Sequence, residues 1–152
     1  MSTIPDAPAA NAPARIQSFG EFWPYYLSEH SDRRCRWVHF VGTSSFLLIL
    51  VTSFLATPLR LGAAIGLGAV LAYATRAMEA KRSTAPVLLT IIVLAGVANP
   101  TTLIGVVLAY ACAWIGHFII EKNRPATFVY PMWSLAGDFR MYGEMLRGRL
   151  WT

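Results

Sequence analysis

Three long stretches without a charged side chain constrain the fold of this chain more than any other feature. Asp, Glu, Lys and Arg are absent from residues 37–59, 61–75 and 83–120, and Arg60 stands alone between the first two stretches. Charged residues make up only 14% of the 152 residues, whereas about 25% is typical of a soluble domain. A helix that crosses a bilayer needs about 20 predominantly apolar residues. The sequence therefore predicts an integral membrane protein.

We expect an all-α membrane protein with four transmembrane helices, near residues 38–57, 59–78, 84–98 and 101–120. The third helix is short because Asn99, Pro100 and Thr101 form a turn signal. It either crosses the bilayer thinly or forms a re-entrant hairpin with the fourth helix. We favour a crossing, because the chain then closes into a simple four-helix bundle.

Basic residues fall on one side of this predicted topology. Lys and Arg occur before the first predicted span, between the second and third, and after the fourth, whereas the two opposite loops hold only Arg60. Because cytoplasmic loops of membrane proteins are enriched in Lys and Arg, we expect both termini to be cytoplasmic, in a bacterial inner membrane or the endoplasmic reticulum. The net charge of +5 would attract anionic membrane lipids. Its spread over one membrane face argues against a nucleic-acid partner.

Segments outside the predicted spans also carry structural signals. Ser18 followed by Glu21 is the pattern of a capping box at a helix start, and the aromatic residues after it suit an N-terminal helix in the membrane interface. Residues 134–150 predict a similar C-terminal interfacial helix. Residues 1–14, rich in Ala and Pro, are expected to be a disordered arm. We expect residues 15–152 to form a single membrane domain.

The predicted topology brings the only three histidines of the chain to one membrane face. His39 opens the first span, His117 lies in the last turn of the fourth, and His30 precedes the first span. Glu121 follows His117 by four residues, a spacing at which two side chains of an α-helix are neighbours. Each residue has an ordinary alternative, because a histidine can pack against a carbonyl group and a glutamate can pair with a basic neighbour. Taken together, ionisable groups at this position favour metal binding.

The ligand types narrow the choice of metal. Three imidazoles, or two with one carboxylate, form a facial set that leaves coordination positions open for O₂ and substrate, as in non-haem Fe(II) oxygenases. Zinc accepts similar ligands and keeps a water in its fourth position. Haem suits the pattern less well, because it would need two histidines facing each other across the bundle interior. The residues alone therefore leave Fe(II) and zinc as alternatives.

Three motifs resemble those of a known family. They are Tyr-Tyr-Leu-Ser-Glu-His at residues 25–30, His39 followed by Val-Gly-Thr at residues 41–43, and Trp-Ile-Gly-His-Phe-Ile-Ile-Glu-Lys-Asn-Arg-Pro-Ala at residues 114–126. In combination these motifs resemble those of a family of small membrane proteins related to 2-hydroxy-palmitic acid dioxygenase. The resemblance covers roughly residues 18–142.

The resemblance implies an Fe(II)-dependent dioxygenase of fatty-acid α-oxidation. A long-chain 2-hydroxy fatty acid and O₂ would give a fatty acid one carbon shorter and CO₂, at the cytoplasmic face of the membrane. The family's presumed iron ligands correspond to His30, His39 and His117, and its glutamate corresponds to Glu121. Glu121 is therefore an expected catalytic residue, either as a fourth ligand or as a partner of one of the ligands.

Four further residues are candidates for supporting roles. Arg124 and Arg34 carry the positive charge that could steady a substrate carboxylate, although each could instead anchor lipid headgroups. Asp138 and Glu29 could orient a ligand histidine, although Asp138 could equally cap the C-terminal helix. The hydroxyl and carboxylate of a 2-hydroxy acid could chelate a metal together while the alkyl tail lies among the helices.

Two other classes of function fit the same residues. A metal-free membrane scaffold or small transporter would use the histidines for packing alone, so that their replacement would change little else. A zinc-dependent lipid hydrolase would use a metal-activated water and would need no O₂. The presence and identity of a bound metal separate the three readings.

Overall fold

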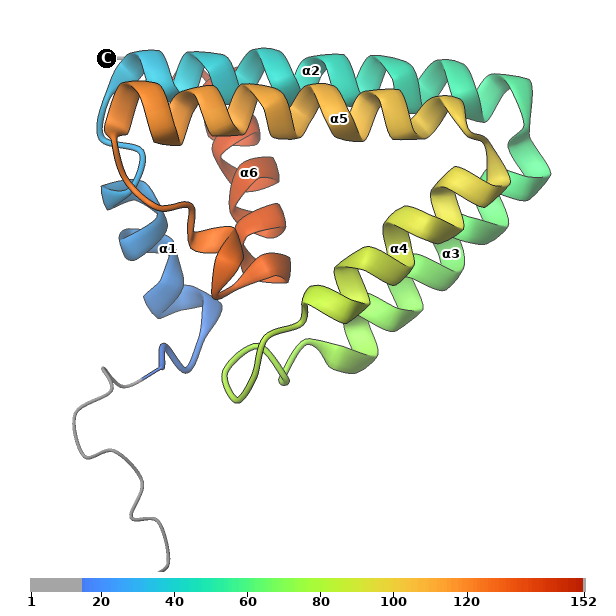
Figure 1. Cartoon of the computed structure of the whole chain (residues 1–152), viewed down its shortest axis with the longest axis horizontal. Coiled ribbons are helices and arrows are strands. Elements are labelled where there is room, and N and C mark those ends of the chain that lie inside the picture. The colour runs from blue at the N-terminus through green and yellow to red at the C-terminus, as the bar shows by residue number, and fades with distance from the viewer. Residues whose placement is uncertain (1–14, 152) are drawn as a thin grey trace, which may run out of the picture.

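The structure, a computed structural model, describes residues 15–151, and the disordered arm expected at residues 1–14 lies outside them. Every regular element of the described residues is a helix, so the all-α prediction is confirmed. In chain order these are α1 (Phe19–Ser28), α2 (Arg33–Ala56), α3 (Pro58–Thr75), α4 (Ala85–Ala98), α5 (Thr101–Trp114), the π-helix η1 (Ile115–Glu121), the 3₁₀ helix η2 (Ala126–Phe128) and α6 (Pro131–Leu146). The helices α2 and α5 run side by side. The α3–α4 hairpin folds back from one end of this pair, and α1 and α6 pack near its other end (Figure 1).

Three helical segments of the described chain are long and apolar enough to cross a membrane. They are Arg33–Ala56, Pro58–Thr75 and Thr101–Glu121, the last of which comprises α5 and η1. The remaining apolar helix, α4, has 14 residues and measures about 21 Å at 1.5 Å per residue. The hydrocarbon core of a typical bilayer is roughly 30 Å thick. The short third span is therefore present as an apolar helix, and its crossing of the bilayer stays a prediction.

Side-chain hydrogen bonds mark both ends of α2. α2 begins at Arg33, before the uncharged stretch, because the Asp32 carboxylate accepts a hydrogen bond from the Arg34 N–H at 2.7 Å. At the opposite end of the pair, the buried side-chain amide of Asn99 donates to the Ser53 carbonyl oxygen at 3.2 Å. This bond joins the α4–α5 turn to the end of α2.

The helices α1 and α6 share an aromatic core beside the α2–α5 pair. Its buried members are Phe22, Tyr26, Ala126, Tyr130, Trp133, Met141 and Met145. Ser18 caps α1 as the sequence pattern predicts, since its hydroxyl accepts from the Glu21 N–H at 3.2 Å. The close approach needs glycine at position 137, because a Cβ on Gly137 would lie 2.7 Å from the Tyr26 ring. The two flanking helices thus pack on each other, and their place in a membrane interface stays a prediction.

Candidate metal centre

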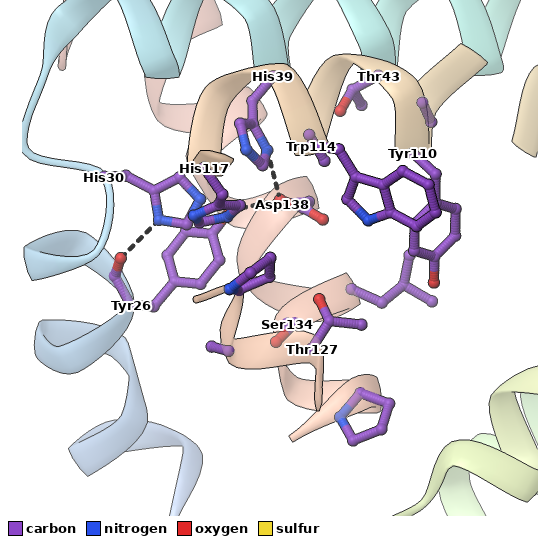
Figure 2. A pocket seen from close by; sticks show the side chains of 16 residues that line it. Tyr26, His30, His39, Thr43, Tyr110, Trp114, His117, Thr127, Ser134 and Asp138 are labelled. Carbon is purple, nitrogen blue, oxygen red and sulfur yellow. Dashed lines mark hydrogen bonds and ion pairs between the residues drawn. The ribbon is translucent and has the colours of Figure 1, made fainter. Parts of the chain in front are cut away.

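The three histidines of the chain meet at one point, although they come from three different elements. His30 lies directly after α1, His39 lies in the second turn of α2, and His117 lies in η1 (Figure 2). All three are buried, and one ligand nitrogen from each lies within 4.8 Å of the others. The structure thus brings the three histidines together, and their role as metal ligands stays a prediction. Their arrangement is that of a group that could hold a single metal ion.

Each imidazole has its Nδ1 atom engaged by an acceptor. The Nδ1–H of His30 donates to the Tyr26 carbonyl oxygen at 2.7 Å, that of His39 to Asp138 Oδ1 at 3.0 Å, and that of His117 to Asn123 Oδ1 at 2.8 Å. Because a carbonyl, a carboxylate and an amide oxygen accept hydrogen bonds and do not donate them, these contacts fix the proton of a neutral ring on Nδ1. The lone pair that could bind a metal ion is then on Nε2.

The Nε2 atoms have the environment expected of ligands. Those of His30 and His39 are buried and have no hydrogen-bond partner among the described residues, and an unpaired buried polar atom calls for an explanation such as an ion. Burial, followed by the neighbouring His39, lowers the pKa of His30 to about 3, so this ring is neutral at physiological pH. The donor set and the unpaired nitrogen atoms therefore fit a metal ion.

The π-helical turn of η1 sets the position of His117. Its backbone pairing is i to i+5 rather than i to i+4, and such turns occur often at functional sites. The turn ends at Lys122, which has a left-handed φ of 56°, and the Asn123 N–H then donates to the His117 carbonyl oxygen at 3.0 Å. The Asn123 side chain also donates to the Glu29 carbonyl oxygen at 2.9 Å. Asn123 thereby joins the segments that carry His117 and His30.

Close contact between α2 and η1 brings His39 and His117 together. A Cβ on Gly116 would lie 2.9 Å from Cys35 Sγ and 3.1 Å from His39 Cδ2, so a larger residue would push the two helices apart. The adjacent cysteine is buried and is not part of a disulfide. The glycine before His117 is therefore a packing requirement of the histidine cluster.

Asp138, on α6, bridges α2 and α1. It accepts from His39 as described and also from the Tyr26 hydroxyl at 2.5 Å. Burial alone would raise the pKa of Asp138, but the hydrogen bonds from His39 and Tyr26 hold this pKa below its usual value. Asp138 is thus an ionised hydrogen-bond partner of His39, and its role in orienting a metal ligand stays a prediction.

The structure places Glu121 outside the three-histidine group. Its carboxylate accepts from the Ser31 hydroxyl at 2.9 Å and from the Asp32 N–H at 2.7 Å. The i, i+4 relation to His117 assumed an α-helix, whereas the segment is π-helical. Glu121 therefore faces the start of α2 and anchors the loop between His30 and that helix.

The other predicted supporting residues also lie away from the three nitrogen atoms. Arg34 is exposed and forms an ion pair with Asp32 at 2.7 Å, and Arg124 is exposed and lies over the Phe128 ring. Glu29 contributes its backbone carbonyl to Asn123, as described above. Sequence reasoning missed Asn123 and the Tyr26 carbonyl as partners of the imidazoles, because no spacing rule marks an amide side chain or a backbone carbonyl for this role.

A pocket of about 80 Å³ lies beside the histidines. Its wall includes Tyr110, Trp114, Thr127 and Ser134 as well as Asp138 (Figure 2). The Ser134 hydroxyl is buried and has no hydrogen-bond partner among the described residues. The residues that form this wall include neither Lys nor Arg. The polar contacts available to a ligand here come from hydroxyl groups, the imidazoles, the Trp114 indole N–H and the Asp138 carboxylate.

The fold and the site together define a class of protein: a helical protein of membrane type with a buried three-histidine centre suited to one metal ion. A family model described as 2-hydroxy-palmitic acid dioxygenase Mpo1-like matches residues 16–150, and the chain belongs to this family. The family name indicates a dioxygenase. No curated protein and no solved structure matches the chain.

Proposed function

We propose that the protein is an Fe(II)-dependent dioxygenase that converts a long-chain 2-hydroxy fatty acid and O₂ into a fatty acid one carbon shorter, CO₂ and water. The observation that carries the proposal is the cluster of three histidines, of which two have a buried, unpaired Nε2. Membership of the dioxygenase family supports the reaction type. Imidazole ligands with open coordination positions beside them are typical of oxygen-using iron sites.

The reaction balances without a further reductant. The bond between the carboxyl carbon and the hydroxyl-bearing carbon breaks, the carboxyl carbon leaves as CO₂, and the hydroxyl-bearing carbon becomes the new carboxyl group. The substrate gives up four electrons, and these reduce O₂. One oxygen atom of the products leaves as water together with the two remaining hydrogens. The site therefore needs to hold only the metal, O₂ and the hydroxy acid.

The residues of the chain have distinct roles in this proposal. His30, His39 and His117 would hold Fe(II), which supplies open coordination positions for O₂ and for the hydroxyl and carboxylate of the substrate. Asp138 keeps His39 in the tautomer that presents Nε2, and Asn123 does the same for His117. Glu121 acts as a positioning residue, because it fixes the loop that follows His30.

The polar wall residues of the pocket would contact the head of the substrate. The unpaired Ser134 hydroxyl can donate a hydrogen bond to a carboxylate, and Thr127 offers a second hydroxyl in the same wall. Hydrogen bonds to an ionised acceptor are stronger than those between neutral groups. We further propose that the protein is integral to the membrane with both termini cytoplasmic, so that the site faces the membrane surface on that side.

The test is turnover of 2-hydroxypalmitate by protein purified without oxygen and then supplied with Fe(II). We expect O₂ consumption and release of the acid one carbon shorter in equal amounts, and loss of both with His39→Ala. Ser45→Ala, on the same helix and outside the pocket wall, is the matched control and should remain active. Absence of both O₂ consumption and the shorter acid from folded, Fe(II)-loaded protein would contradict the proposal. Hydrolysis of a lipid ester that needs no O₂ would then favour the zinc hydrolase.

A further inference from the structure

A second cavity, of about 140 Å³, adjoins the pocket of the histidines. Its wall is formed by residues of α2, α4, α5 and α6. The residues that line both cavities are Thr43, Ala109, Tyr110, Leu135 and Asp138. Because the two spaces share these wall residues, the second cavity lies directly beside the pocket of the candidate metal centre.

The spacing of residues along α2 explains why one helix contributes to the walls of both cavities. His39 is followed along the helix by Thr43, Phe46 and Leu50 in the cavity wall, at steps of four, three and four residues. Residues at such steps lie on one face of an α-helix. One face of α2 therefore runs from a candidate ligand directly into the second cavity.

The helix α5, which runs antiparallel to α2, also carries cavity-wall residues along the face that leads away from its histidine. From His117 toward the start of the helix, the wall residues are Tyr110, Val106 and Thr102, again at multiples of three to four residues. At 1.5 Å per residue, Thr102 lies roughly 22 Å from His117 along the axis. The two long helices thus place their histidines at one end of an elongated, shared wall.

The chemistry of the wall changes along its length. The shared end carries Thr43, Tyr110 and the Asp138 carboxylate, whereas α4 contributes only aliphatic side chains. These are Leu88, Ile91, Ile92 and Ala95. A cavity of this size with aliphatic walls stays dry and takes up small apolar groups. The space next to the polar site is therefore suited to a hydrocarbon.

We propose that the second cavity binds the alkyl chain of the substrate, with the polar head at the histidines and α4 as the wall that selects for chain length. The inference rests on the proposed function, since it assigns the head to the metal centre. A volume near that of a cavity that holds benzene accommodates a segment of a long chain. The rest of the chain leaves past Phe139, a cavity-wall residue that is 40% exposed.

Two substitutions fill the cavity at different depths, and each has a matched control. Ala109→Phe blocks the shared end and Ala95→Phe narrows the wall on α4. Val107→Phe and Val97→Phe add the same ring two residues away on the same helices, at positions that are 65% and 80% exposed. Thermal unfolding and metal content of all four variants show whether the fold and the histidine cluster are retained.

The first readout is kcat/KM for hydroxy acids of different chain length. We expect Ala109→Phe and Ala95→Phe to lose about tenfold or more for 2-hydroxypalmitate, because an overfilled site excludes the chain. Ala95 lines only the second cavity, so activity of Ala95→Phe on 2-hydroxybutanoate, whose chain ends before that cavity, should change by less than about twofold relative to Val97→Phe. Ala109 lines both spaces, so Ala109→Phe should lose activity on both acids. An unaltered chain-length profile in Ala95→Phe would contradict the proposal.

The second readout does not depend on turnover. Metal-free protein in lipid nanodiscs is irradiated with a 2-hydroxypalmitate analogue that carries a diazirine in its chain, and labelled residues are mapped by mass spectrometry. We expect labelling at Phe46, Ile91 or Val106 that 2-hydroxypalmitate competes away and that the cavity variants abolish. Labelling restricted to exposed faces, or labelling that 2-hydroxypalmitate does not reduce, would identify bilayer lipid as the occupant and overturn the proposal.

The two readouts distinguish failure of the cavity from failure of the reaction. If wild-type protein turns over no hydroxy acid but the cavity is labelled competitively, the proposed reaction is wrong and the chain-binding site stands. If 2-hydroxypalmitate is turned over and neither readout responds to the cavity variants, the reaction stands and the chain-binding site is wrong.

Discussion

The Asp138 carboxylate lies 3.0 Å from Nδ1 of His39, whose other ring nitrogen, Nε2, is buried and has no hydrogen-bond partner among the described residues. The same carboxylate accepts from the Tyr26 hydroxyl. A carboxylate behind a ligand histidine raises the basicity of the ring and fixes its orientation. Asp138 is thus placed to act on a bound metal through His39.

Replacement of this carboxylate should weaken metal binding without unfolding the protein. Asp138→Asn keeps an oxygen acceptor for His39 but loses the negative charge, and changes of this kind lower metal affinity by about 10–100-fold. Titration against a competing chelator measures the affinity. Glu144→Gln, an acidic residue of the same helix that pairs with Arg149, is the control. Equal affinities for the two variants would show that Asp138 has no influence on the metal.

The Glu121→Gln variant tests whether Glu121 is a metal ligand or a positioning residue. Because the Glu121 carboxylate bonds to Ser31 and to the Asp32 N–H, we expect the amide variant to keep its metal and to lose stability. A charged hydrogen bond contributes about 1.5–3 kcal/mol, and part of that loss should appear as a lower unfolding temperature. A variant with wild-type thermal stability but little bound metal would instead identify Glu121 as a ligand.

Replacement of the two arginines that the sequence suggested for the substrate carboxylate should have little effect on substrate binding. Arg34→Ala and Arg124→Ala remove exposed groups that are absent from the described pocket wall, so we expect KM for the hydroxy acid to change by no more than about twofold. Steady-state kinetics with Ser134→Ala in parallel provides the comparison, since its hydroxyl lies in the pocket wall. A large rise of KM in either arginine variant would place the carboxylate outside the pocket described here.

Glu79 gives a pH dependence that is independent of the metal. This residue is buried in the α3–α4 loop, and burial raises its pKa although the Thr84 hydroxyl and the amides of Met132 and Trp133 lower it in part. A raised pKa in the folded state means that stability is lost as pH rises from about 4.3, the usual value, through the folded pKa. The Glu79→Gln variant has no carboxyl group to ionise at this position, so it does not lose stability in this way as pH rises.

The prediction for Glu79→Gln is therefore a difference that grows with pH. The unfolding temperature of the variant minus that of the wild type should be larger at pH 7 than at pH 4. Glu144→Gln provides the reference for removal of a carboxylate that is held by ion pairs with the exposed Arg147 and Arg149. A difference that is constant over this range would show that Glu79 is not strained by its burial.

The sequence is sufficient to predict the helical class and the meeting of the histidines. Uncharged stretches define the long helices, and the distribution of basic residues predicts that His30, His39 and His117 lie at one membrane face, where the structure clusters them. Side-chain directions could not be predicted in the same way. The π-helical turn redirects Glu121, and one partner of the imidazoles is a backbone carbonyl group, which no sequence pattern marks.

The central claim is that three histidines hold one metal ion, and elemental analysis tests it most directly. Protein purified in detergent without oxygen should contain about one iron per chain, and the His39→Ala, His117→Ala double variant should contain none while remaining helical by circular dichroism. Zinc at the same stoichiometry would favour the hydrolase. A folded wild-type protein that binds neither metal, even when either is supplied, would contradict the account and leave a scaffold with three structural histidines.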